Sequence, residues 1–327
     1  IMQFFSHNQQ KIINKDLLRI YKNSRKNLES DIQIISTVCD YLFKAQGKRI
    51  RPMLMLIVSK CFALNRKKLT DNLATIIELI HTATLLHDDV VDESKMRRSM
   101  QSINSKFGNS IAVLVGDFIY SKSFQIMATL NSNNIVRILS NCTNRIAEGE
   151  VLQSFFANNI NITIDDYLVL IESKTAQLFE TSCHLALIDS KYETKIINSV
   201  KRFGKYLGMA FQITDDILDY EGVTKKTGKK NGIDFLKGYY TLPLIYALSN
   251  CPKSEKKQII KFLVDDNPKK DFKIIQKFVI TNSGLHKAKD MAKHYIHLAK
   301  KELTKFPNNH WKNSLISICD NMLDRKS

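Results

Sequence analysis

Two aspartate-rich motifs contain the residues of this chain that are best suited to chemistry. The first spans residues 88–92 (DDVVD) and the second spans residues 215–219 (DDILD). On a helix, the first and last aspartates of each motif lie one turn apart on the same face, where like charges repel. Both motifs lie within apolar runs, so this repulsion is costly unless a cation neutralises it. Carboxylate oxygens suit Mg²⁺, which keeps water ligands and shares its shell with substrate phosphates.

A solvated acidic helix face is the alternative interpretation of one such motif. The second copy, again in apolar surroundings, weakens that alternative. Two carboxylate clusters that face each other could hold several Mg²⁺ ions around one diphosphate.

Basic side chains accompany the motifs at four places. They are Gly47 to Pro52 (GKRIRP), Arg97-Arg98 after the first motif, Lys174-Thr175, and Lys229 beyond the second motif. Each place alone is weak evidence, because a basic pair usually belongs to a solvated surface. Together they supply guanidinium forks and ammonium groups for two diphosphates.

The chain of 327 residues has a formal net charge of +17, from 49 basic and 32 acidic residues. Such a surplus raises nucleic acid, an acidic membrane or anionic substrates as partners. Most of it is lysine scattered among Asn and Ile, which is typical of solvated faces, so we predict no nucleic-acid partner.

The cysteines are widely spaced and form no Cys-x-x-Cys pair, which indicates a reducing compartment. No run of 18 apolar residues occurs, so we predict no transmembrane segment.

The elements that must position these residues are helices. Segments 72–90, 110–130, 165–190 and 196–220 carry apolar residues at three- and four-residue spacing, and alternating stretches are scarce. The chain has 11 Gly and 5 Pro, so few residues break helices. We predict an all-α, single-domain bundle over residues 1–327, with about ten or more helices around a central cavity.

On these residues, the chain resembles the trans-isoprenyl (polyprenyl) diphosphate synthases, and in particular the bacterial octaprenyl diphosphate synthases. Besides the two motifs, the resemblance rests on Gly47 to Pro52, His81 to His87, Arg97-Arg98, Val115 to Phe118, Glu148 to Glu150, Lys174 to Ala176, and Phe211-Gln212. It extends over residues 15–325. The paired motifs are highly specific in combination, and they imply the all-α isoprenoid synthase fold.

The resemblance also implies a role for each residue of the site. Mg²⁺ would be bound by Asp88, Asp92 and Asp215, with support from Asp89, Asp216 and Asp219. The allylic diphosphate would be held by Arg97, Lys174 and Lys229, and isopentenyl diphosphate by Lys48, Arg51, His81 and Arg98. The reacting centre would be lined by Thr175 and Gln212, which count as catalytic together with Lys174 and Lys229.

The reaction implied by the resemblance is a prenyl transfer. A Mg²⁺-dependent enzyme would condense an allylic diphosphate with successive isopentenyl diphosphates into a long, octaprenyl-like chain for quinone biosynthesis, including ubiquinone. No side chain is an obvious base, and the resemblance implies that the departed diphosphate takes the proton. Relatives are usually homodimers. The expected location is the bacterial cytoplasm or an organelle matrix, and the protein could touch a membrane peripherally to release its product.

Product length is predicted from the helix that carries the first motif. Ala83 and Thr84 are small and lie about one turn before Asp88 on that helix. In the family, a bulky residue at this level stops growth early, so small residues resemble the long-chain members. Ile80, with Ile76 and Ile77 beyond it, would line a deep apolar tunnel, and Phe124 with Met127 would form a lower floor. The alternative is that Ala83 is an ordinary core residue that favours the helix.

One stretch departs from the family pattern. Relatives often read GDDLxEGKxT after the second motif, whereas residues 232–241 here read GIDFLKGYYT. Ile233 replaces an acid, Lys237 replaces an acid, and Tyr239 replaces a lysine that contacts diphosphate, although Lys237 could substitute for it. Ser99 also stands where relatives commonly have Gly.

Two rival functions follow from the same residues. A terpene cyclase or squalene-synthase-like enzyme would share the fold, but such chains seldom carry the GKRIRP type of segment. A non-catalytic partner subunit of a heteromeric synthase typically has eroded aspartate motifs, whereas both motifs are intact here. The altered stretch around Tyr239 is the feature that favours this second rival.

Overall fold

The computed structural model of the chain describes residues 5–44, 47–221, 232–264 and 271–323. This part of the chain is built almost entirely of helices, so the prediction of an all-α bundle with more than ten helices is confirmed. The first half contains α1 (His7–Asn27), α2 (Gln33–Lys44), α3 (Ile50–Cys61), α4 (Lys67–Val91), β1 (Met96–Arg97), β2 (Met100–Gln101), α5 (Ile103–Phe107), α6 (Asn109–Ala128) and α7 (Asn133–Phe156). The second half contains α8 (Ile164–Ile171), the π-helical turn η2 (Glu172–Ala176), α9 (Gln177–Ala186), α10 (Thr194–Glu221), α11 (Ile233–Leu236), α12 (Leu242–Asn250), α13 (Lys253–Val264), α14 (Phe272–Thr281), α15 (Gly284–Leu303) and α16 (His310–Asp320).

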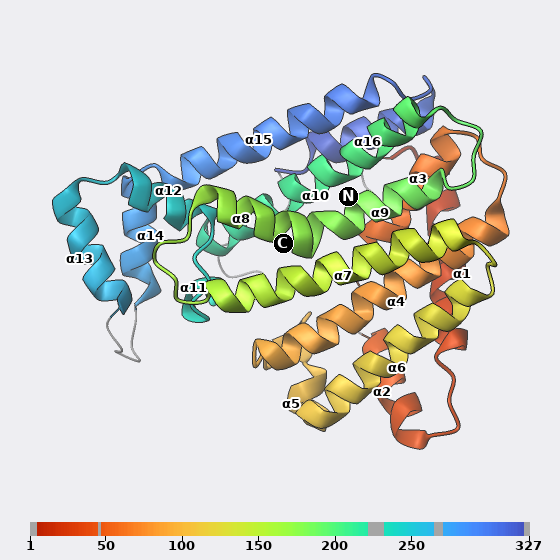
Figure 1. Cartoon of the computed structure of the whole chain (residues 1–327), viewed down its shortest axis with the longest axis horizontal. Helices are drawn as coiled ribbons and strands as arrows, with labels where there is room; N and C mark the ends of the chain where they lie inside the picture. The colour runs from red at the N-terminus through yellow and green to blue at the C-terminus, as the bar shows by residue number, and fades with distance from the viewer. Residues whose placement is uncertain (1–4, 45–46, 222–231, 265–270, 324–327) are drawn as a thin grey trace.

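Long helices run side by side through the middle of the molecule (Figure 1). Helix α4 contacts α6 along its length, and α10 contacts both α9 and α15. Helices α12, α13 and α14 gather at one end of the molecule, away from α6. The aspartate motifs therefore lie on two of the long central helices, α4 and α10.

Helix α4 forms because its apolar residues recur at helical spacing. Leu73, Ile76, Ile77, Ile80 and Ala83 are all buried on one side of it. The helix ends within the first aspartate motif, where the backbone N–H of residue 92 donates to the carbonyl of residue 88 at 2.8 Å. The motif thus occupies the last turn of a helix whose apolar face is anchored in the core.

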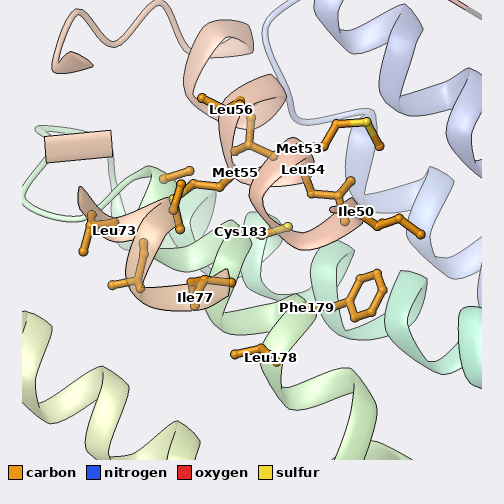
Figure 2. Close-up of a cluster of buried hydrophobic side chains, with 14 of the residues drawn as sticks. Ile50, Met53, Leu54, Met55, Leu56, Leu73, Ile77, Leu178, Phe179 and Cys183 are labelled. Carbon is orange, nitrogen blue, oxygen red and sulfur yellow. The ribbon is translucent and has the colours of Figure 1, made fainter. Parts of the chain in front are cut away.

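Two hydrophobic clusters stabilise the bundle, and α10 belongs to both. Its first half contributes Val200, Phe203 and Leu207 to the first cluster, which includes α1, α3, α4, α6 and α9. Its second half contributes Ile213 and Ile217 to the second cluster, which includes α8, α12, α14 and α15. Figure 2 shows part of the first cluster, where side chains of α3, α4 and α9 converge.

Helix α6 bears on the prediction that no segment spans a membrane. By length and composition it could cross one, with 33% of its most apolar stretch buried. Asp117 and Lys122 interrupt that stretch, which is why it contains no long uncharged run. The core helix of a soluble protein passes the same test, and α6 packs against α4, so this finding is weak evidence for a span.

Candidate active site

The two aspartate motifs meet at one cavity of about 290 Å³. Asp88 and Asp92 reach it from the end of α4, and Asp215 and Asp216 reach it from α10. Asp234 of α11 adds a fifth carboxylate to the wall. The remaining wall includes Arg97, Lys174, Thr175, Gln212 and a set of apolar side chains, among them Leu85, Phe156, Ile162, Leu170 and Ile171. The cavity therefore combines a carboxylate cluster with an apolar lining, which suits a diphosphate with an apolar tail.

A second, smaller cavity of about 70 Å³ adjoins the first and shares Leu85 and Arg97 with it. Its lining includes the ionisable residues Arg49, Glu78, His81, Asp89, Arg97 and Arg98. Three guanidinium groups in one small space form a site for an anion. Two adjoining cavities thus exist, one rich in carboxylates and the other rich in arginine.

Arg97 is the charged residue that faces both cavities, and Asp89 fixes its position. The Nε atom of Arg97 lies 2.8 Å from both carboxylate oxygens of Asp89, and its Nη2 atom lies 2.7 Å from Oδ1. Asp89 is only 3% exposed. A buried carboxylate that holds a guanidinium by several bonds fixes its direction, so Asp89 positions Arg97 and is turned away from the carboxylate-rich cavity.

The arginine pair lies on a tight hairpin. Strands β1 and β2 pair Met96 with Gln101 and Arg97 with Met100, which leaves Arg98 and Ser99 as the two turn residues. Both have positive φ angles, of 50° and 63°. Two positive φ angles are the requirement of the favoured two-residue hairpin, and glycine meets it at the lowest cost. Ser99, where relatives commonly have Gly, therefore adopts a backbone conformation that strains a side chain of its type.

The close packing of α10 places the second motif. Gly204, Gly208, Gln212 and Asp216 recur every four residues and share one face of the helix. A Cβ atom at Gly208 would lie 2.6 Å from Cα of Ala176, and one at Gly204 would lie 2.7 Å from the carbonyl oxygen of Phe179. The two glycines let α10 approach η2 and α9, and the next two turns then bring Gln212 and Asp216 to the cavity.

A chain of hydrogen bonds orders this face. The Thr175 hydroxyl donates to Oε1 of Gln212 at 2.7 Å, and Nε2 of Gln212 donates to Oδ1 of Asp216 at 2.7 Å. The Tyr167 hydroxyl donates to Oδ2 of Asp216 at 2.6 Å. Burial raises the pKa of Asp216 well above its usual value, and the charge of Asp234 raises it further. Both oxygens of Asp216 accept hydrogen bonds, and Asp216 is buried, whereas Asp215 is an exposed residue on the cavity wall.

Asp219 caps α11 instead of lining either cavity. Its carboxylate accepts hydrogen bonds from the backbone N–H groups of Ile233 and Asp234, at 3.2 and 3.3 Å. Asp234 in turn points into the larger cavity, and burial with the nearby charge of Asp219 raises the pKa of Asp234 to about 7. The third carboxylate that α10 and α11 bring to this cavity is thus Asp234.

Lys174 lies on η2, a π-helical turn of the kind that often marks a functional site. Its ammonium group is 2.5 Å from Oε2 of Glu150 and 3.7 Å from Oδ2 of Asp88. Burial lowers the pKa of Lys174, but these two carboxylates outweigh that effect and the net shift is upward. On α7, a Cβ atom at Gly149 would lie 2.7 Å from the backbone nitrogen of Lys174, so glycine permits the close approach of α7 to η2.

The remaining predicted anion ligands lie in different surroundings. The Nη1 atom of Arg51 lies 3.0 Å from Nε2 of His81, which must accept because arginine only donates. Burial lowers the pKa of His81 well below its usual value, so the ring is neutral. The guanidinium of Arg51 also stacks 4.8 Å from the ring of Phe179, and neither Arg51 nor the exposed Lys48 lines the two cavities. Lys229 lies outside the described residues.

The residues predicted to set product length lie behind the carboxylates. Ala83 and Ile80 are fully buried in the first hydrophobic cluster, and neither lines the two cavities. Thr84 is half-buried, and its hydroxyl donates to the carbonyl oxygen of His81 at 2.9 Å. Met127 is buried, whereas Phe124 is 38% exposed, which does not suit the floor of a buried tunnel in a single chain.

Sequence reasoning missed several residues of the site. Tyr167 and Glu78 carry no local signal, because one is a lone tyrosine and the other a lone acid on an apolar helix. Arg49, whose guanidinium lies 4.6 Å from the ring of Tyr21, belongs to the basic segment Gly47 to Pro52 but is not among the predicted diphosphate ligands. Glu150 lies within a segment that carries the family resemblance, and Asp234 matches an acid of the family pattern within the altered stretch 232–241, so the signal for these two was present.

Residues 32–279 match the family model described as "Polyprenyl synthetase". The chain is 35% identical over 317 residues to an octaprenyl diphosphate synthase of Haemophilus influenzae, with 97% of this chain and 96% of that protein covered. It is 36% identical over 293 residues to the octaprenyl diphosphate synthase of Escherichia coli, with 90% of each chain covered.

The chain belongs to the polyprenyl synthetase family. Among solved structures, this family member superposes with a TM-score of 0.91 on a Caulobacter crescentus polyprenyl synthase complexed with calcium and isoprenyl diphosphate, at 32% identity and 97% coverage of both chains. It superposes with a TM-score of 0.90 on a decaprenyl diphosphate synthase of Rhodobacter capsulatus, at 32% identity and with 98% and 99% of the chains covered. The predicted family and the isoprenoid synthase fold are therefore confirmed.

Proposed function

We propose that the chain is a Mg²⁺-dependent, long-chain trans-polyprenyl diphosphate synthase that serves quinone side-chain biosynthesis. The observation that carries this proposal is the convergence of both aspartate motifs on one cavity, beside a second cavity rich in arginine. The names of relatives support a long product, since they include octaprenyl and decaprenyl diphosphate synthases. Both motifs are intact and reach the cavity, which counts against a non-catalytic partner subunit.

The donor set of the larger cavity fits a hard divalent cation. Asp88, Asp92 and Asp215 offer carboxylate oxygens, and Asp234 adds to them. Within the described residues, no group of three or more His, Cys, Asp or Glu side chains is close enough to hold a metal alone. Diphosphate oxygens and water would therefore complete the shell, as Mg²⁺ prefers. When bound, Mg²⁺ would stabilise the negative charge that develops on the leaving diphosphate.

The side chains of the chain itself bind and orient the substrates. Arg97 and Lys174, held by Asp89 and Glu150, would grip the allylic diphosphate. As the allylic C–O bond breaks, the diphosphate leaves with the electron pair, and the double bond of isopentenyl diphosphate attacks the allylic carbon. The proton lost from the new chain would pass to the departed diphosphate. The apolar side chains of the cavity would keep water from the electron-poor carbon.

The experiment uses purified protein with farnesyl diphosphate, labelled isopentenyl diphosphate and Mg²⁺. We expect products longer than geranylgeranyl diphosphate. Asp88→Asn and Asp215→Asn should each lower turnover by about 10²–10³-fold, the typical loss when one preorganised stabilising group is removed. Asp189→Asn, at an exposed aspartate outside the cavity, is the matched control. Near-normal turnover in either cavity variant, or short products alone, would contradict the proposal.

We also propose a homodimer, with α6 at its interface. One side of α6 packs on α4, while Val113, Leu114 and Phe124 on its outer side are 38%, 63% and 38% exposed. Exposed apolar side chains at helical spacing fit a subunit interface. Leu114→Glu should shift the protein towards monomer in sedimentation velocity. Leu18→Glu, at an apolar residue of α1 that is 58% exposed, should leave the dimer intact.

Release of an apolar product fits peripheral contact with a membrane. Lys11, Lys15, Lys22 and Lys67 surround the exposed Leu18 on α1 and carry no ion pair with a described acidic residue. This basic face suits an anionic bilayer. Cosedimentation with anionic vesicles, but not neutral ones, would support the contact.

The six cysteines are free thiols, which fits a reducing compartment such as the bacterial cytoplasm or an organelle matrix.

A further inference from the structure

Lys237 contacts the first aspartate motif from the opposite half of the chain. Its ammonium nitrogen lies 2.9 Å from Oδ2 of Asp92 and 3.1 Å from the hydroxyl oxygen of Ser94. The Tyr239 hydroxyl donates to Oδ1 of the same aspartate at 2.9 Å. Both oxygens of Asp92 are therefore occupied by Lys237 and Tyr239, two of the residues that depart from the family pattern.

The turn that carries Lys237 and Tyr239 is tied down on both sides. At its start, the carboxylate of Asp219 accepts from the first two backbone N–H groups of α11. At its end, the backbone N–H of Asn158 donates to the carbonyl of Gly238 at 2.8 Å. Gly238 has a φ angle of 81°, and a Cβ atom there would collide with the Asn158 side chain. This turn thus joins the second aspartate motif to the first.

The surroundings make the ion pair stronger than a surface pair. The side chains of Lys237 and Asp92 are 23% and 16% exposed, so water screens their attraction only in part. Asp92 also lines the cavity in which the metal would bind. An ammonium group and a divalent cation on one carboxylate repel each other strongly at such short range.

We propose that Lys237 is a built-in placeholder for the divalent cation at Asp92. Its ammonium group neutralises the carboxylate before metal binds, and it leaves the carboxylate when metal arrives. Tyr239 is neutral and keeps its hydrogen bond in both states. This inference rests on the proposed metal-dependent function.

The test is a titration with Mn²⁺, which prefers the same oxygen ligands as Mg²⁺. Free Mn²⁺ is counted by electron paramagnetic resonance in the full chain with inorganic diphosphate, which supplies the oxygen ligands that the carboxylates lack. A protein-free titration corrects for the Mn²⁺ that diphosphate itself binds. Lys237→Met removes the charge that competes with Mn²⁺, so we expect the Kd for Mn²⁺ to fall about three- to tenfold. A change of this size corresponds to the free energy that a partly buried ion pair contributes. Tyr239→Phe leaves the ammonium charge of Lys237 in place, and we expect the Kd of this variant for Mn²⁺ to stay within about twofold of the parent value.

Lys60→Met is the matched control for loss of an ion pair elsewhere. Lys60 lies 2.8 Å from Asp16, with side chains 28% and 12% exposed, and it is remote from both cavities. This variant should bind Mn²⁺ as the parent does, and Lys237→Arg should also keep the parent affinity. Circular dichroism checks folding, and Lys237→Gln repeats the test if Lys237→Met is unfolded.

The outcomes separate the inference from the function on which it rests. Unchanged or weaker Mn²⁺ binding in the folded Lys237 variants overturns the placeholder while leaving the synthase proposal intact. A parent protein that binds no Mn²⁺, even with inorganic diphosphate added, overturns the metal-dependent function and the placeholder together.

Discussion

The Tyr167 hydroxyl donates a hydrogen bond of 2.6 Å to Oδ2 of Asp216, and both residues are buried. Tyr167 comes from α8 and Asp216 from α10, so the bond joins two helices that face the carboxylate-rich cavity. Together with the amide of Gln212 it holds the least exposed aspartate of the second motif in one orientation.

Removal of this hydroxyl should lower stability more than removal of an ordinary tyrosine hydroxyl. Tyr167→Phe leaves one oxygen of a buried carboxylate unpaired, and we expect a loss of about 1.5–3 kcal/mol in the free energy of unfolding. Tyr192→Phe is the control, because its hydroxyl donates to the neutral carbonyl of Phe62 at 3.0 Å and should cost about 0.5–1.5 kcal/mol. Urea denaturation measures both values. Equal losses would contradict the special role of the Tyr167 hydrogen bond.

The two cavities predict a split between the two arginines of the hairpin. Arg98→Ala should mainly raise the KM for isopentenyl diphosphate, because Arg98 lines only the smaller of the two cavities. Arg97→Ala should also weaken allylic binding, because Arg97 lines both. Asp89→Asn, which loosens Arg97, should reproduce part of the Arg97→Ala effect. Initial-rate kinetics with each substrate varied in turn gives the comparison, and the reverse pattern would refute this division.

Product length provides a test of the tunnel along α4. Ala83→Phe should shorten the main product towards farnesyl or geranylgeranyl diphosphate without abolishing condensation, because the new ring would block the growing tail. Thr84→Phe probes the half-buried neighbour one turn before Asp88 and should act in the same direction. Chromatography sizes the products. An unchanged long product from the Ala83 variant would mean that Ala83 is an ordinary core residue.

Acid should weaken the fold through Glu302, far from the cavity. Burial would raise its pKa, but Arg202, Lys305 and Ser199 outweigh burial and lower the pKa of Glu302 to about 2. A carboxylate whose pKa is lower in the folded than in the unfolded state adds stability above the unfolded value. That stability is lost as pH falls from about 5 towards 2.

We expect Glu302→Gln to lose about 1–2 kcal/mol at pH 7 and less at pH 2.5, where the parent has already lost most of the same contribution. Urea denaturation at the two pH values gives the difference. Glu29→Gln, at an exposed glutamate without a described ion pair, is the control and should change little at either pH. A parent and Glu302 variant that differ equally at both pH values would rule out this carboxylate as the cause.

The sequence predicted the helices and the two aspartate motifs because both depend on local pattern. Apolar spacing sets α4 and α10, and a motif on a helix presents its aspartates on one face. It did not predict that Asp219 caps α11, that Asp234 takes a place on the cavity wall, or that Lys237 reaches Asp92. These contacts depend on how separate helices pack and on turns such as the one at Gly238. No periodicity encodes a pairing between residues so far apart in the chain.

The membership of α10 in both hydrophobic clusters has a consequence for synthesis on the ribosome. Domains fold from the N-terminus as they emerge, at about 5–20 residues per second. The first half of α10 can pack on α9 as soon as it appears, because α9 precedes it, and α15 and α16 complete its cluster later. The second half must wait for α12, α14 and α15, so the apolar residues beside the second motif stay uncovered for several seconds. During that interval the nascent chain exposes a hydrophobic stripe that a chaperone could bind.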